Sequence, residues 1–340
     1  MVDVPLLTIS IPTFNRAQYL SVLLEQLKAE LATVRPGVVE LIVSDNASDD
    51  QTARVVEQAM ASGLQLRSLR NATNIGSDAN IAQCFNEATG RYVLIMGDDD
   101  LLVDGALGRL LGHLQGSDYG LVCLRAYGFE LDFRAEMPTI RGRSHTYNHP
   151  GRYLARIAHF MTLISASVIN KSLLGDVDAR SFCGENLVQV HLSVMASVRA
   201  AQNLYVDKYE IAVKRNNSGG YDHSRVFVSN LLGILDGFVA RGIDAQDVRR
   251  IERRLLLSYL PFYLFRLRLS ESGVQEAQKN FSERFGHRLL FLVWAKPALF
   301  WPHWPALIWA AAITLIGRLM DGDFLRGFSF VRNRVLRYMK

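Results

Sequence analysis

The chain has 340 residues, which is enough for one large domain or two ordinary ones. Hydrophobic residues make up 49% and charged residues 21%, a composition that can bury a sizeable core and excludes a disordered chain. The net charge is +5, and the whole excess lies in residues 324–340, which carry five cations and no acid. A basic tail on a neutral body does not favour nucleic acid, so we expect no nucleic-acid partner.

The cysteines and the N-terminus indicate the compartment. Cys84, Cys123 and Cys183 form no C-x-x-C pair, so neither a disulfide framework nor a cysteine-built zinc site is expected. The apolar run at 6–11 stops at Pro12 and does not form a secretory signal. We expect no membrane-spanning helix, because no uninterrupted apolar segment reaches about 18 residues. The protein is therefore expected on the cytoplasmic side of the membrane.

The first part of the chain alternates strands and helices. Apolar, β-rich runs predict strands over 6–11, 38–44, 64–69, 92–96 and 120–125. Helical spacing of apolar residues predicts helices over 17–31, with Asn15 as its N-cap, and over 50–62, 77–89 and 105–114. This alternation predicts an α/β fold with a doubly wound, mostly parallel sheet.

Polar residues follow four of the predicted strands. In open α/β sheets, ligands bind outside the carboxyl ends of the strands. The four polar groups are Thr13 and Asn15, Asp45 and Asn46, Asn74 and Gly76, and Asp98, Asp99 and Asp100. Neither G-x-G-x-x-G after the first strand nor a P-loop is present, so the usual dinucleotide and P-loop cradles are not expected. The four groups together predict one binding site at this edge of the sheet.

The three consecutive carboxylates predict a metal ion. They cannot all be ionised at low cost without a cation beside them. One Mg²⁺ or Mn²⁺, held by one or two carboxylates and completed by substrate phosphates, would neutralise them. The alternative is a solvated acidic turn. Their position after a buried strand, beside three other polar groups, favours the metal.

Four segments in this order carry a family resemblance. They are IPTFNR at 11–16, VSDNASDD at 43–50, NIG at 74–76, and GRYV at 90–93 leading into the acidic triplet. Together they resemble the signature of family-2 glycosyltransferases with the GT-A fold, over about residues 5–220. The triplet followed by Leu101-Leu102 resembles the abequosyltransferase-like and O-antigen enzymes. The resemblance implies an inverting, metal-dependent transfer of a sugar from a nucleotide diphosphate sugar.

The resemblance also implies residue roles in donor binding. Thr13 and Asn15 would lie against the nucleoside, Asp45 would hydrogen-bond the base, and Asn46 and Asn74 would line the nucleotide pocket.

The acidic triplet corresponds to the D-x-D motif of the family. Asp99 matches its metal-binding carboxylate, with Asp98 towards the ribose or sugar and Asp100 towards the metal. Gly97 stands where the first Asp is usual, so the second metal-side carboxylate stays open between Asp98 and Asp100. Ala79-Asn80 replaces a frequent Arg-Asn pair and removes one expected cation.

An inverting transfer needs a general base for the acceptor hydroxyl. The family takes it from a Glu-Asp motif at a helix start, which here is Glu185-Asn186 before a predicted helix over 187–198. Glu185 is therefore the expected base, Asp176 and Asp178 are weaker alternatives, and a helix-start acid without catalytic role stays open.

Two residues of the following segment resemble later family positions. Arg215, after a predicted strand over 209–213, would neutralise the departing diphosphate. His223 is either a third metal ligand or a surface residue.

The last third of the chain predicts a membrane-facing region. Helices are expected over 224–242 and over 247–270, the second interrupted at Pro261. Apolar segments follow at 289–295, 298–301 and 306–316, and they hold all four tryptophans of the chain, Trp294, Trp301, Trp304 and Trp309. With the basic tail, this predicts monotopic attachment to an anionic membrane at the cytoplasmic face of the inner membrane. A buried helical core is the alternative.

These observations divide the chain into a catalytic domain that binds nucleotide sugar, residues 1–222, and a helical membrane-associating region, residues 223–340. We expect an inverting glycosyltransferase that uses a polyprenyl-linked glycan acceptor in bacterial surface polysaccharide synthesis. The alternative is a non-catalytic scaffold that binds nucleotide sugar or lipid, because Asn186 and Gly97 replace two expected acids. Donor, acceptor, linkage and oligomeric state stay open.

Overall fold

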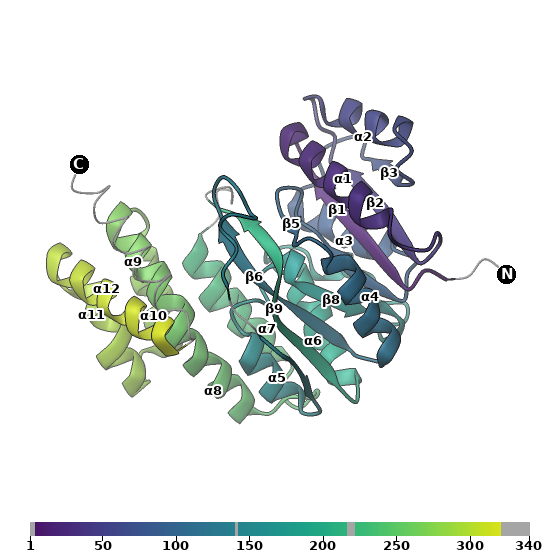
Figure 1. Cartoon of the computed structure of the whole chain (residues 1–340). Coiled ribbons are helices and arrows are strands. Elements are labelled where there is room, and N and C mark those ends of the chain that lie inside the picture. The colour runs from purple at the N-terminus through teal and green to yellow at the C-terminus, as the bar shows by residue number, and fades with distance from the viewer. Residues whose placement is uncertain (1–3, 140–141, 216–221, 321–340) are drawn as a thin grey trace. The chain divides into compact units, whose positions relative to one another are not determined.

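The structure of the protein is a computed structural model that describes residues 4–139, 142–215 and 222–320 (Figure 1). The chain divides into two compact units, residues 1–220 and residues 221–340. The basic tail identified at 324–340 lies outside the described residues.

Each strand and helix predicted over the first 125 residues is present in the first unit, with ends displaced by a few residues. In chain order the elements are β1 (Leu7–Thr13), α1 (Ala17–Leu31), β2 (Val39–Asp45), α2 (Thr52–Ala61), β3 (Arg67–Arg70), α3 (Ser77–Glu87), β4 (Tyr92–Ile95), β5 (Leu101–Leu102), α4 (Ala106–Gly116) and β6 (Leu121–Phe129). They continue with β7 (Ser144–Tyr147), α5 (Pro150–Ile157), η1 (Ile164–Ala166), β8 (Ser167–Asn170), η2 (Lys171–Leu173), η3 (Ala179–Phe182), α6 (Val188–Arg199) and β9 (Asn203–Lys214).

The strands form one nine-stranded sheet in the order β3-β2-β1-β4-β8-β6-β9-β5, with β7 paired to β9. The expected α/β class is confirmed. The first four strands are parallel, as the alternation of strands and helices predicts. Beyond β4 the sheet is mixed, because β8 runs antiparallel to both of its neighbours and β5 and β7 run antiparallel to β9.

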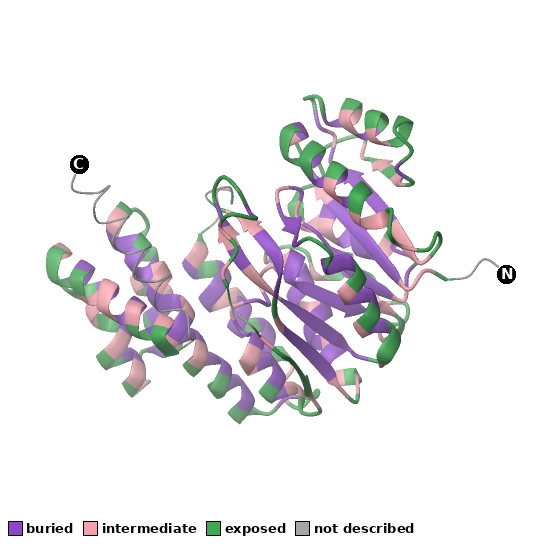
Figure 2. Ribbon diagram, viewed as in Figure 1, coloured by how far each residue is buried: buried purple, intermediate pink, exposed green. Residues whose placement is uncertain are grey.

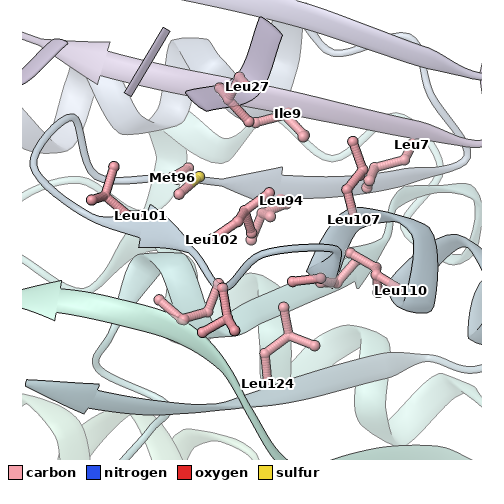
Figure 3. Close-up of a cluster of buried hydrophobic side chains, with 14 of the residues drawn as sticks. Leu7, Ile9, Leu27, Leu94, Met96, Leu101, Leu102, Leu107, Leu110 and Leu124 are labelled. Carbon is pink, nitrogen blue, oxygen red and sulfur yellow. The ribbon is translucent and has the colours of Figure 1, made fainter. Parts of the chain in front are cut away.

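Alternation along β1 separates two faces of the sheet. Leu7, Ile9 and Ile11 belong to a buried cluster that includes Leu27 of α1 and Leu107 of α4 (Figure 3). Helices α3 and α6 contact the sheet and each other, and they cover the opposite face. The central strands are consequently buried on both faces (Figure 2). This packing fixes where each strand ends, and therefore where the polar residues after it lie.

The second unit is helical. Its elements are η4 (Arg225–Asn230), α7 (Leu231–Gly237), α8 (Ala245–Arg254), η5 (Leu255–Tyr259), α9 (Leu260–Ser270), α10 (Val274–Phe285), η6 (Phe291–Ala295), α11 (Lys296–Phe300) and α12 (His303–Met320). The largest buried side chains of its core are Phe265, Phe281, Phe285 and Phe291.

Two prolines of this unit lie near the start of a helix. The helix predicted over 247–270 is divided into α8 and α9 by the π-helical segment η5, and Pro261 lies in the first turn of α9, where a missing N–H is tolerated. Pro305 likewise lies within the start of α12. As a result α12 runs for 18 residues and is, by length and composition alone, apolar enough to cross a membrane, with 33% of it buried.

Candidate functional site

The carboxyl ends of the parallel strands bring the predicted polar groups together. In the parallel register Thr13 pairs with Asp45, and Asp45 pairs with Arg70. Contacts between side chains then join neighbouring groups: Thr13 Oγ1 donates to Asp98 Oδ2 at 2.7 Å, and Asn46 Nδ2 donates to Asn74 Oδ1 at 2.8 Å. We call this edge of the sheet the rim.

The three acids of the rim have different partners. Asp98 is buried and accepts from Thr13 and from Nη1 of Arg16, the latter at 3.1 Å. The same Nη1 donates to Asp99 at 3.1 Å. Asp100 is also buried, and its two oxygens accept from the Ser165 hydroxyl at 2.6 Å and the Lys214 backbone N–H at 3.2 Å. Asp99 is thus the most accessible carboxylate of the three.

Burial and mutual repulsion disfavour the charged forms of two acids. Burial raises the pKa of Asp98 to about 6, although the guanidinium of Arg16 opposes the shift. Burial, and after it the negative charge of Asp99, raises the pKa of Asp100 well above the ordinary value of a carboxyl. A cation held between Asp99 and Asp100 would therefore stabilise their ionised forms.

The donor set near Gly97 fits a divalent cation. A Cβ atom at Gly97 would lie 3.2 Å from Asp99 Oδ1 and 3.2 Å from Asp100 Oδ2, so these two oxygens face a common point. Within the described residues there is no group of three or more His, Cys, Asp or Glu side chains that could hold a metal. Two carboxylates suit Mg²⁺ or Mn²⁺, which keep water and substrate phosphates as their other ligands.

The asparagines of the rim build a loop. Asn46 donates to Asn74 and accepts from Asn71 Nδ2 at 3.0 Å and the Ile75 N–H at 2.9 Å. Asn74 Oδ1 also accepts from the Gly76 N–H at 2.9 Å. These hydrogen bonds order residues 71–76 directly before α3. Their predicted place along a nucleotide pocket stays a prediction.

Asp45 has an unsatisfied oxygen. Its carboxylate is buried, and Oδ1 accepts from the Ser48 N–H at 2.9 Å. Oδ2 has no hydrogen-bond partner among the described residues, and its nearest cation is Nε of Arg70 at 3.6 Å. A buried acceptor without a donor is costly and is suited to a ligand N–H.

Asn15 is not the N-cap of α1, which corrects the expectation. It adopts a left-handed backbone with φ +54°, and its Oδ1 accepts from the Asp49 N–H at 2.9 Å. Arg16 holds the cap position, and Asp50 accepts from the Ala17 N–H at 3.0 Å. Asn15 therefore joins the loop after β1 to the loop after β2.

Glu185 lies in the loop before α6 and not in its first turn. Its Oε2 is 3.1 Å from Nε2 of His191. The neighbouring N–H groups of Gly184 and Asn186 donate to one oxygen of Asp78, in the first turn of α3. Because α3 begins directly after Gly76, these contacts hold the Glu185 loop at the rim end of the helix.

The two alternative bases lie at the other end of α3. Asp178 accepts from Asn86 Nδ2 at 2.6 Å, in the last turn of that helix. Asp176 lines a cavity of about 550 Å³ with Gly90, Arg91 and Lys171, at the amino end of β4. A helix of this length separates its ends by roughly 16 Å, so neither acid shares the rim.

The remaining two candidates have local partners. Arg215 follows Lys214 directly, and its side chain lies over Gly128 with Nη1 3.7 Å from Glu136. His223 belongs to the second unit, where its ring packs against Phe227 and Tyr263. Asn216, Asn217 and Ser218 lie outside the described residues. A role of Arg215 on the diphosphate and of His223 on the metal stays a prediction.

Four residues of the site were not singled out from the sequence. Arg16 stands within the IPTFNR segment, so its position in the motif was the available signal. Asp78, Ser165 and His191 gave no signal. Asp78 and Ser165 contact residues far along the chain, and His191 contacts Glu185, six residues before it and outside the helix.

Comparisons with known proteins agree with this geometry. The family model described as Glycosyl transferase family 2 matches residues 8–177, half of the chain. The chain is 31% identical over 121 residues to abequosyltransferase RfbV of Salmonella typhimurium, covering 35% of this chain and 36% of that protein. It is 32% identical over 108 residues to a GalNAc(5)-diNAcBac-PP-undecaprenol beta-1,3-glucosyltransferase of Campylobacter jejuni, covering 32% and 34%. The chain thus spans about a third of these relatives.

Solved structures with a similar fold cover nearly the whole chain. S. aureus TarS 1-349 in complex with UDP-GlcNAc has a TM-score of 0.63 at 16% identity, covering 93% of this chain and 92% of that one. The mannosyltransferase PcManGT of Pyrobaculum calidifontis, in complex with GDP-Man and Mn²⁺, has a TM-score of 0.51 at 16% identity, covering 92% and 88%. At these identities the likeness is one of fold, and that fold is GT-A.

Proposed function

The chain belongs to glycosyl transferase family 2, and from this membership we propose that it transfers a sugar from a nucleotide diphosphate sugar to a glycan acceptor with inversion. The observation that carries the proposal is the meeting of Asp99 and Asp100 at Gly97, on the same rim as the unsatisfied oxygen of Asp45. This arrangement offers an acceptor for a nucleobase N–H at one point and paired carboxylates for a metal-bound diphosphate at another.

Each rim residue binds a different part of the donor. Asp45 accepts a hydrogen bond from the base, while Thr13 and Asn15 lie at the ends of the loops that enclose the nucleoside. Asp99 and Asp100 would hold Mg²⁺ or Mn²⁺, which would supply stabilisation of the negative charge on the diphosphate. Asp98 orients Arg16 and faces the ribose or sugar. Arg215, which directly follows the Asp100 contact at Lys214, supplies a second cation for the leaving group.

Glu185 acts as the general base. It takes the proton of the acceptor hydroxyl while that oxygen attacks the anomeric carbon from the face opposite the diphosphate. The new glycosidic bond forms as the bond from the anomeric carbon to the phosphate oxygen breaks, and the nucleoside diphosphate leaves. Support for this role is the position of the Glu185 loop at the rim end of α3.

The second unit suits an acceptor carried by a membrane lipid. Of the eighteen large hydrophobic side chains that are exposed among the described residues, ten lie between 289 and 320. This segment contains no Asp or Glu. Exposed members of this apolar surface include Leu289, Val293, Trp301, Trp304, Ile308 and Leu319. Exposed tryptophan beside lysine and arginine favours the headgroup layer of an anionic bilayer at the cytoplasmic face.

A donor screen tests the proposal. The purified full chain is incubated with UDP-, GDP-, CDP- and dTDP-sugars and Mg²⁺ or Mn²⁺, with a synthetic polyprenyl-diphosphate-linked sugar as acceptor. We expect release of a nucleoside diphosphate and a glycosylated lipid for at least one donor. No release across the panel contradicts the proposal.

A non-catalytic scaffold is the second candidate, because Asn186 stands where the family has an Asp. Glu185→Gln distinguishes the two candidates. If the protein is an enzyme, the variant loses sugar transfer and keeps donor binding. If it is a scaffold, the variant binds the donor as the wild type does and neither protein transfers sugar.

A further inference from the structure

The carboxylate of Glu185 has a hydrogen-bond partner outside the rim. Oε2 of Glu185 lies 3.1 Å from Nε2 of His191, which is in α6. An ionised carboxylate can only accept hydrogen bonds, so Nε2 of the imidazole carries the hydrogen and donates it. This bond fixes one oxygen of Glu185 relative to a helix.

The His191 ring packs against a second aromatic side chain. Its ring stacks on Phe182, with centroids 4.6 Å apart and planes 8° from parallel. The His191 side chain is 19% exposed, whereas that of Glu185 is 47% exposed. The carboxylate is thus more accessible than the imidazole; it meets the ring at its Nε2 edge, while Phe182 packs on the ring face.

The backbone on both sides of Glu185 is held as well. The N–H groups of Gly184 and Asn186 donate to the same Asp78 oxygen at 2.8 Å and 2.9 Å. Both residues have positive φ, +114° and +58°, which glycine and asparagine tolerate better than most residues. Asp78 thus fixes the loop, and His191 fixes the side chain that the loop presents.

We propose that His191 is a positioning residue for Glu185 and aims its carboxylate at the acceptor hydroxyl. The inference rests on the proposed function, in which Glu185 is the base. Since Asn186 cannot take a proton, Glu185 is the one carboxylate between Gly184 and α6. Its orientation then determines how often the acceptor hydroxyl is within reach, so the effect falls on turnover and not on donor binding.

The test compares His191→Phe, which can keep the stack on Phe182 but donates no hydrogen bond, with His191→Gln, which keeps a donor. Transfer is measured on the full chain with the best donor of the UDP-, GDP-, CDP- and dTDP-sugar panel, Mn²⁺ and the synthetic polyprenyl-diphosphate-linked sugar. We expect His191→Phe to lower kcat about 10–100-fold with the donor KM within about twofold, and His191→Gln to recover part of the loss. In a Glu185→Gln background, His191→Phe should cost nothing more. His113→Phe, on α4, is the control.

Three outcomes overturn the inference. Full kcat in His191→Phe, with Glu185→Gln inactive, removes the positioning role and leaves the proposed function intact. A loss that adds fully to that of Glu185→Gln assigns His191 a separate role. If Glu185→Gln itself keeps wild-type transfer, the proposed base is wrong as well. Should His191→Phe not fold, as judged by its thermal unfolding, His191→Asn is used, because its shorter amide cannot span the distance to Glu185.

Discussion

Nη1 of Arg16 lies 3.1 Å from the carboxylate of Asp99, so the expected metal ligand is already paired with a cation of the chain. The same nitrogen is equally close to Asp98, and Asp100 lies next along the chain. Arg16 therefore supplies part of the positive charge that the acidic triplet requires. A cation held at Asp99 would supply positive charge to the same carboxylates.

Replacing Arg16 should lower the stability of the protein and increase the stabilisation that Mn²⁺ gives it. Arg16→Gln removes two charge-assisted hydrogen bonds, and we expect the free energy of unfolding to fall by about 1–3 kcal/mol. Chemical denaturation with and without Mn²⁺ measures this. Because a cation can replace the guanidinium charge, Mn²⁺ should stabilise the variant more than the wild type. An equal effect of Mn²⁺ on both proteins would argue against a shared site.

Asp99→Asn tests the metal assignment directly. Loss of the accessible carboxylate should lower turnover about 100-fold or more, since the metal supplies several kcal/mol of transition-state stabilisation. The midpoint of thermal unfolding should not fall, because removing one negative charge relieves repulsion with Asp100. Asp118→Asn, an exposed acid paired to Arg91, is the control. Unchanged turnover in Asp99→Asn would remove the metal from this residue.

The rim could be predicted because its polar residues directly follow predicted strands in the sequence. Each polar group follows an apolar run that reads as a strand, and parallel strands end at a common edge, so Asp45 and Asp98 were expected to meet. The α/β class followed from the same alternation, GT-A was implied by the resemblance of the four motifs, and both were confirmed. Gly90, directly before β4, is explained by packing. A Cβ atom at this position would lie 2.6 Å from the Thr8 backbone nitrogen, so only glycine allows the chain to approach β1 this closely.

The rest depends on contacts that no local pattern encodes. Strands β5, β7 and β8 were not predicted, and they make the sheet mixed because each runs antiparallel to its neighbours. Asn15 has the residue type of an N-cap, but a tertiary bond from the Asp49 N–H takes its side chain. His191 meets Glu185 only because a loop with two positive φ angles turns the carboxylate back along α6.

Asp45→Asn should weaken donor binding without affecting folding. The amide keeps the acceptor for Ser48 at Oδ1 but places a donor where Oδ2 stands, so it repels the base N–H instead of accepting from it. We expect the donor Kd to rise about 10-fold, the equivalent of one lost hydrogen bond to a charged group, with a smaller change in kcat. Calorimetric titration measures this, with Asp49→Asn as the exposed control from the same loop. Unchanged affinity would exclude Asp45 from base recognition.

Asn46→Ala separates a structural role from donor recognition. Both ends of the Asn46 amide are engaged inside the protein, and their loss would leave the loop at 71–76 without its organising side chain. We therefore expect a loss of about 1–3 kcal/mol in the free energy of unfolding, together with weaker donor binding. Denaturation and titration of the same sample measure both. A variant of normal stability that binds no donor would instead mean that Asn46 contacts the nucleotide.

The apolar surface of the second unit predicts binding to anionic lipid. Trp304 and Ile308 lie one turn apart on α12, and both are largely exposed. Replacing both with serine removes apolar area from the bilayer contact without opening the core. Cosedimentation with vesicles of neutral lipid plus phosphatidylglycerol should then show at least a 10-fold weaker association, since each buried side chain of this size contributes about 1.5–3 kcal/mol. Leu131→Ser, which removes an even more exposed apolar side chain from the first unit, should bind as the wild type does. If the double variant also binds as the wild type does, α12 does not face lipid, and a protein partner covers this surface instead.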